Sequence, residues 1–323
     1  MTDAGQASSA APSRKNSLLR LLGTLVAAAL LVFWLYQNWA EVVDAFRKVG
    51  WPGLLAAFAL TLLSRLFTAG RWYALLRSAE VPIRPRQSVE LTFAGLFSAN
   101  FLPTTVGGDL VRFAAGVKLG LDGAVLAAAL VADRLVGLAG MASVLPLGLY
   151  QLFNTPLPGS FLPGGPAASI ALPAFLRRPA DFLWAQFLKA LRSLAQAIRL
   201  WLSHPRGLLL AYLFTWGHML AVFLSVWLLF HRMGEAIPLW LVGGCWAMSY
   251  FPTLLPLSIN GLGVQELTLT FFFVHYGGVS LPSALAMAAL MRLLPALASL
   301  PGAFFVPGLL SAQKDAPLPD SSK

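Results

Sequence analysis

Acidic residues and arginines recur at close spacing inside stretches that are otherwise apolar. Asp109 precedes Arg112 by three residues, and Asp133 is adjacent to Arg134. Arginine offers paired donors to a phosphate, and a carboxylate can bind an amino group or neutralise an arginine while the site is empty. We predict that seven side chains surround one central polar cavity and bind substrate there: Asp109, Arg112, Asp133, Arg134, Asn260, Glu266 and Arg292.

The same residues have a purely structural alternative. Asp109 with Arg112, and Asp133 with Arg134, could be local ion pairs that stabilise a helix bundle. Charged groups at membrane depth cost about 2.5–3.5 kcal/mol each on insertion scales and usually mark a transport pathway. The sequence alone leaves both interpretations open.

Composition indicates where these residues lie. The chain of 323 residues is 58% hydrophobic and 11% charged, with a mean hydropathy of +0.72. Soluble domains carry about 25% charged residues. The sequence therefore predicts an all-α polytopic membrane protein.

Charge and metal-ligand content exclude several other classes. The net charge of +10 does not require nucleic acid as a partner, because basic residues gather on one set of loops, as in membrane proteins. A single cysteine, Cys245, excludes an intrachain disulfide. The four histidines lack paired metal-ligand spacing. We predict no metal and no cofactor.

Two helix breaks separate the charged residues from the apolar runs before them. Pro103, Gly107 and Gly108 form the first break, and Gly261 and Gly263 form the second. The run 88–103 makes roughly 24 Å of helix, short of a hydrocarbon core of about 30 Å. Each break is therefore predicted to be the tip of a re-entrant hairpin, with a cytoplasmic loop between two spans as the alternative for the first.

The remaining elements complete the predicted topology. Each half has three spans, one hairpin and an amphipathic surface helix, with residues 18–150 as the first repeat and 151–310 as the second. Short polar cytoplasmic tails, 1–17 and 311–323, flank this single domain. The predicted spans are 18–37, 51–70, 122–150, a weak 167–176, 207–230 and 282–306, and the predicted surface helices are 39–50 and 182–201.

Rare residues repeat between the halves. Asp109 precedes Arg134 by 25 residues, and Glu266 precedes Arg292 by 26. Three spans per half would invert the second half, as in many transporters. Chance similarity between apolar segments is the alternative.

Several residues receive a plainer interpretation. Arg71 is assigned with other arginines to a cytoplasmic loop after residue 70, and Arg65 to a snorkelling or packing role. Tryptophans near predicted span ends are assigned to interfacial anchoring: Trp34, Trp39, Trp51, Trp72, Trp201 and Trp240.

Four motifs in order resemble the lysylphosphatidylglycerol synthase transmembrane family, which includes the flippase half of multiple peptide resistance factor. They are RWxxLL at 71–76, FLPxxxGGDxxR at 101–112, DRxxGL at 133–138 and NGxGxxE at 260–266. The resemblance implies a bacterial inner-membrane protein that moves a polar-headgroup lipid between leaflets. Only a short tail follows residue 306, so we expect no aminoacyl-transferase module and no lipid aminoacylation by this chain.

The expected partner is a membrane lipid, with the headgroup open. Two other functions remain in view. One is an integral-membrane enzyme acting on lipid or polyprenyl-phosphate substrates. The other is a non-transporting scaffold that binds a lipid-modifying enzyme.

Overall fold

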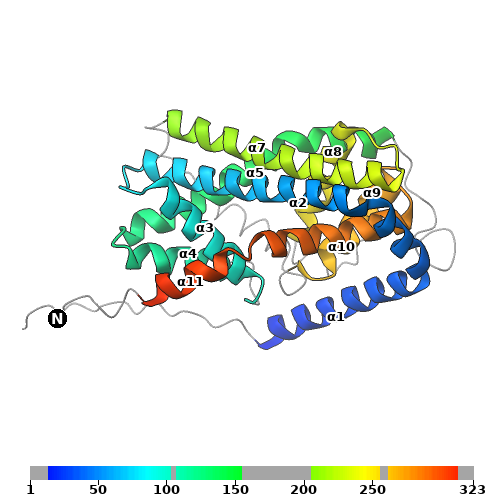
Figure 1. Ribbon diagram of the computed structural model, residues 1–323, viewed down its shortest axis with the longest axis horizontal. Helices are drawn as coiled ribbons and strands as arrows, with labels where there is room; N and C mark the ends of the chain where they lie inside the picture. The colour runs from blue at the N-terminus through cyan, green and yellow to red at the C-terminus, as the bar shows by residue number, and fades with distance from the viewer. Residues whose placement is uncertain (1–13, 103–106, 155–204, 255–260, 312–323) are drawn as a thin grey trace, which may run out of the picture.

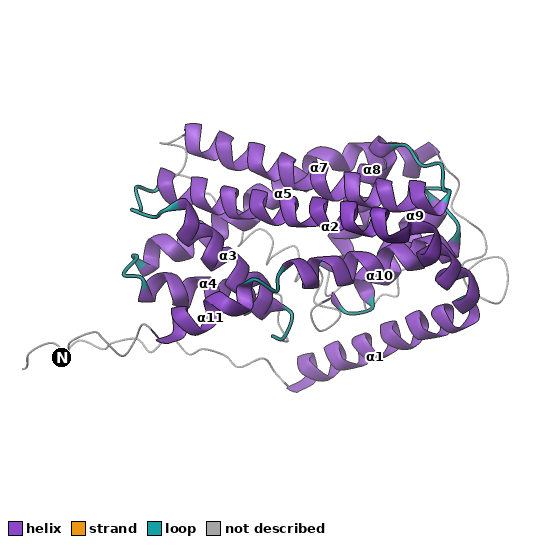
Figure 2. Cartoon of the chain, in the orientation of Figure 1, coloured by secondary structure: helices purple, strands orange, loops and turns teal. Residues whose placement is uncertain are grey.

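The structure of the protein is a computed structural model, which describes residues 14–102, 107–154, 205–254 and 261–311. Within these ranges the chain forms helices joined by short loops and turns, and it has no strand (Figure 2). The predicted weak span 167–176, the surface helix 182–201, Pro103 and Asn260 lie outside the described residues. The helices are α1 Arg14–Gln37, α2 Trp39–Ser78, α3 Pro85–Ala99, α4 Gly107–Lys118, α5 Gly123–Asn154, α7 Pro205–Met233, α8 Leu239–Thr253, α9 Val264–His275, α10 Leu281–Ala298 and α11 Gly302–Ser311.

Within the described residues, 4 stretches are long and apolar enough to cross a membrane: Trp39–Ser78, Gly123–Asn154, Pro205–Met233 and Leu281–Val306. They coincide with the predicted spans 51–70, 122–150, 207–230 and 282–306. The last stretch is interrupted, because α10 ends at Ala298 and α11 begins at Gly302. The predicted all-α polytopic membrane fold is confirmed.

Helices α2 and α7 pack side by side and run antiparallel (Figure 1). A Cβ on Gly70 of α2 would lie 2.6 Å from a ring carbon of Phe214 of α7, and one on Gly217 would lie 2.9 Å from the ring of Phe67. Glycine at these positions lets the aromatic rings approach the opposite backbone. Corresponding helices of two inverted halves would pack in this way.

Each hairpin packs against a helix of the other half. The first hairpin (α3 and α4) contacts α11, and the second (α8 and α9) contacts α5. At the α5–α8 crossing, a Cβ on Gly148 would lie 2.5 Å from the carbonyl oxygen of Gly244. At the α11–α3 crossing, a Cβ on Gly302 would overlap the carbonyl of Phe93. Each hairpin is therefore in contact with a helix from the other half of the chain.

The predicted surface helix 39–50 and the span after it form one element, α2, with a bend at Gly50. Gly50 has φ 63° and ψ 169°, a conformation that glycine adopts with little strain. Before the bend, Val42, Ala45 and Val49 are buried against the bundle. The apolar face of this segment thus packs on protein.

The predicted loop after residue 70 begins too early. Helix α2 continues to Ser78, so Arg71 lies within a helix and not in a loop. Trp72 has no exposed surface, which excludes an interfacial role for it. The run after Gly70 contains no helix breaker, and a buried acid from another helix offsets the charge of Arg71.

Cysteines placed just before the bend of α2 and at the start of α3 are expected to react from opposite sides of the membrane. The 28 residues of α2 after the bend span about 42 Å, more than a hydrocarbon core of about 30 Å. Lys48→Cys, before the bend of α2, and Arg86→Cys, in the first turn of α3, give exposed thiols beyond either end of this stretch in a Cys245→Ala background. Labelling of intact cells with a membrane-impermeant maleimide should modify one of them, and labelling of both would contradict this topology.

Candidate functional site

Five charged side chains form a continuous ion-pair network between α2, α4 and α5. Nε of Arg71 lies 2.7 Å from Oδ1 of Asp133, whose Oδ2 lies 3.3 Å from Nη1 of Arg112. The same Nη1 lies 3.4 Å from Oδ1 of Asp109, and Nη2 of Arg134 lies 2.6 Å from Oδ2 of Asp109. Four of these residues were predicted as site residues, and Arg71 was missed.

Arg112 is the central cation of this network and is only partly satisfied. Its guanidinium carbon lies 3.9 Å from the ring centroid of Trp72, in cation–π geometry. Its Nε and Nη2 atoms are buried without a hydrogen-bond partner in the described residues. Three arginines face two aspartates, so the network carries one surplus positive charge.

The second half contains an equivalent pair. Nη1 of Arg292 lies 3.5 Å from Oε1 of Glu266, while Oε2 of Glu266 accepts a hydrogen bond from the backbone N–H of Gly263 at 2.8 Å. Asp109 and Glu266 each occupy the first turn of a hairpin return helix, where a negative charge is favourable. Each acid pairs with an arginine of the next long helix, and the two pairs have nearly the same spacing along the chain.

The glycines of the two hairpins allow close contacts. A Cβ on Gly108 would lie 2.5 Å from the carbonyl oxygen of Gly95, and one on Gly107 would lie 2.5 Å from Cβ of Leu102. Gly261 and Gly263 have φ of +69° and +78°, and Gly263 also packs against α1. Gly108 therefore lets α4 approach α3 closely, and Gly261 and Gly263 adopt a backbone conformation that favours glycine.

A central cavity of about 590 Å³ lies between the two halves. Its wall includes the C-terminal end of α3 and residues of the second hairpin, together with α2, α5, α7 and α10. Of the seven predicted binding residues, Arg292 lines this cavity, and Asp109, Arg112, Asp133, Arg134 and Glu266 do not. The structure thus holds two charge clusters and a cavity where the sequence predicted one cluster. Polar and charged residues in the wall include Arg65, Asn100, His218, Tyr250 and Arg292.

Arg65 and His218 line this cavity, although the sequence analysis did not predict either of them as a binding residue. Nε of Arg65 is buried without a hydrogen-bond partner in the described residues, and the side chain lines the cavity. Nδ1 of His218 lies 2.8 Å from Oγ of Ser64. A polar stripe at helical spacing, Thr61, Ser64, Arg65 and Thr68, was the available signal.

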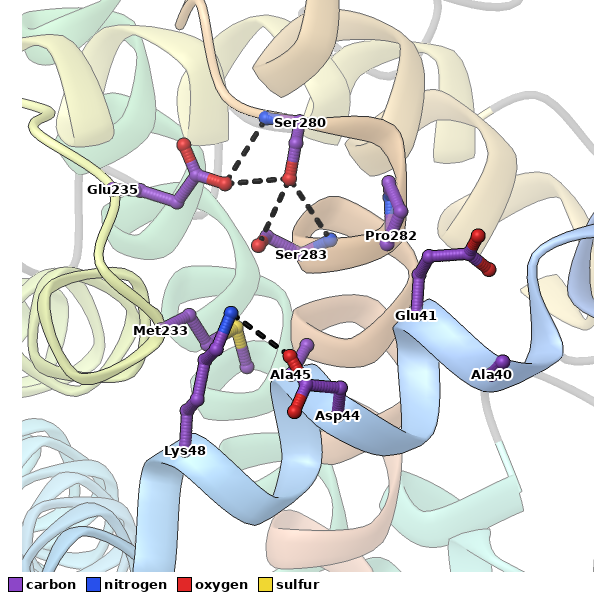
Figure 3. Close-up of a pocket in the computed structure, with 10 residues that line it drawn as sticks. All are labelled: Ala40, Glu41, Asp44, Ala45, Lys48, Met233, Glu235, Ser280, Pro282 and Ser283. Atoms are coloured by element: carbon purple, nitrogen blue, oxygen red, sulfur yellow. Dashed lines mark hydrogen bonds and ion pairs between the residues drawn. The ribbon is translucent and has the colours of Figure 1, made fainter.

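A second, surface pocket of about 460 Å³ lies beside the bend of α2 (Figure 3). Nζ of Lys48 lies 2.9 Å from Oδ2 of Asp44, and both side chains are more than half exposed. Burial raises the pKa of Glu235, but hydrogen bonds from Ser280 and Ser283 outweigh it, and the pKa falls below the usual value. No group of three potential metal ligands occurs in the described part of the chain.

Long apolar helices with paired charges buried among them define an integral, helical membrane protein. The chain belongs to the family described as lysylphosphatidylglycerol synthase TM region, which matches residues 20–302. This family is a membrane domain linked to lipid handling, and the resemblance stated from the four motifs is confirmed. No curated protein sequence matches the chain.

Proposed function

We propose that the protein moves a polar lipid headgroup between the leaflets of the bacterial inner membrane, through the central cavity. One observation supports this most directly: a cavity of about 590 Å³ with cationic and polar walls lies between two hairpins inside an apolar bundle. The acyl chains would remain in the lipid while the headgroup crosses. Both chain ends would be cytoplasmic, and the two halves would form an inverted repeat.

The energetic problem of such a protein is desolvation. A charged headgroup loses water on entering the hydrocarbon core, and this costs several kcal/mol unless polar groups replace the water. Arg292 would contact the headgroup directly. The network of Asp109, Arg112, Asp133 and Arg134 would form an adjoining part of the path or fix the helices beside it.

Filling the cavity is expected to stop transport. Ala296 lines it, so Ala296→Trp would place an indole where the headgroup passes. Proteoliposomes with a fluorescent phospholipid in both leaflets are treated with a membrane-impermeant reductant. Unaltered protein should expose nearly all of the dye, whereas the variant should expose only the outer half, as vesicles without protein do.

The neighbouring residue gives a matched control. Leu297 is 40% exposed and does not line the cavity. Leu297→Trp should therefore transport like the unaltered protein, with both variants eluting as the same species in size-exclusion chromatography. Equal transport by both tryptophan variants would refute the cavity as the route.

Hydrolysis of a lipid ester is a second candidate, because Ser64 and His218 form a hydroxyl–imidazole pair at 2.8 Å. Such a pair is the start of a nucleophile–base arrangement. Ser64 is only 1% exposed, and no carboxylate contacts the imidazole of His218 in the described residues. Mass spectrometry of lipids recovered from the proteoliposomes decides the point, since transport leaves them chemically unchanged.

A further inference from the structure

Arg65 stands in the wall of the central cavity as a cation without an acidic partner in the described residues. Its Nε atom is buried and makes no hydrogen bond there, although arginine has five N–H donors. Burying a cation costs free energy unless an anion pairs with it. The unused donors of Arg65 therefore indicate a ligand that brings its own negative charge.

The other charges around the cavity point the same way. Arg292 supplies a second guanidinium, and the described cavity wall contains no carboxylate. The nearby acid, Glu266, is already used by Arg292 through one oxygen and by the N–H of Gly263 through the other. An ammonium group entering this cavity would meet the like charge of Arg65, a second guanidinium that already holds Glu266, and no available acid.

We propose that the cavity binds an anionic phosphate group, namely the phosphodiester of a lipid headgroup that carries no cationic substituent. Arg65 would supply paired donors to the phosphate oxygens, and Arg292 would supply a second cation. Tyr250 and Trp246 in the wall add an O–H and an N–H donor. This names the substrate class of the proposed function and rests on it. It also separates the ligand from a lysyl-bearing lipid, whose headgroup carries ammonium groups.

Binding can be measured apart from transport. The full-length protein in a non-ionic detergent is titrated calorimetrically with dihexanoylphosphatidylglycerol, dihexanoylphosphatidylcholine, lysyl-dihexanoylphosphatidylglycerol and inorganic phosphate. Of these four, dihexanoylphosphatidylglycerol (the glycerol lipid below) should bind most tightly. Arg65→Gln should weaken it about tenfold to hundredfold, the range for hydrogen bonds to a charged group, and Arg65→Lys should weaken it less.

The control removes a positive charge far from the cavity. Arg86 is 89% exposed and pairs with Glu90, so Arg86→Gln should bind like the unaltered protein. Equal affinity for the glycerol and choline lipids, or no loss in Arg65→Gln, overturns the proposal, even if lipid transport is observed. Inorganic phosphate binding as tightly as the glycerol lipid overturns the assignment to a lipid. Selective anion binding without any transport would support the proposed binding site and contradict only the proposed transport.

Discussion

Asp133→Asn is expected to lower the free energy of unfolding by about 3–5 kcal/mol, the usual cost of removing one partner from a buried ion pair. Asp133 is 7% exposed and neutralises both Arg71, at 2.7 Å, and Arg112, at 3.3 Å. Asparagine keeps the size of the side chain but leaves Arg71 without an acidic partner and Arg112 with Asp109 alone. Equilibrium unfolding of the purified protein in mixed micelles with increasing dodecyl sulfate measures the loss.

The control for this variant is a pair in solvent. Asp44 and Lys48 are 58% and 55% exposed, and such pairs contribute about 0–1 kcal/mol. Asp44→Asn should therefore unfold at the same dodecyl sulfate fraction as the unaltered protein. Unfolding of Asp133→Asn at the same dodecyl sulfate fraction as Asp44→Asn would mean that the network does not stabilise the fold.

Gly244→Leu is expected to separate α5 from α8 and to lower the free energy of unfolding by about 3 kcal/mol or more, since overpacking a core typically costs about 1–3 kcal/mol. A Cβ at Gly244 would lie 2.7 Å from the backbone nitrogen of Gly148 and 2.9 Å from its Cα. Backbone atoms cannot rotate away as a side chain can, so the two helices must move apart. The same unfolding experiment measures the cost, and Gly244→Ala should give a smaller loss of the same sign.

Gly123 of α5, the helix that Gly244 of α8 faces, provides the comparison. A Cβ there would lie 3.6 Å from the ring of Phe113, which is an ordinary contact. Gly123→Ala should be neutral or slightly stabilising, because alanine favours helix. Gly244→Leu as stable as Gly123→Ala would show that α5 and α8 are not packed backbone to backbone.

The parts of the fold that follow from local pattern were predictable from the sequence. Apolar runs of span length and the glycine breaks marked the helices and hairpins. The spacing of Asp109 to Arg134 matched that of Glu266 to Arg292, and both pairs are ion pairs in the structure. A carboxylate at the start of one helix and an arginine on the next can be recognised from chain spacing alone.

The parts that depend on contacts between distant segments were not predictable. Arg71 resembled one more basic residue of a loop, because its partner Asp133 is 62 residues further along the chain. Arg65 resembled a snorkelling residue, because only the assembled bundle places it in a cavity wall. The sequence contained both arginines and their helical surroundings, but the pattern of one segment does not specify which other segment faces it.

The exchanged packing of the hairpins bears on how the molecule assembles. Helix α11 covers the first hairpin, and α5 covers the second. The first hairpin packs on α2 and α5 of its own half, but its contact with α11 forms only after that later helix has been synthesised and inserted. Until then, the side of α3 that carries Phe93 and Phe97 lacks its contact with Gly302.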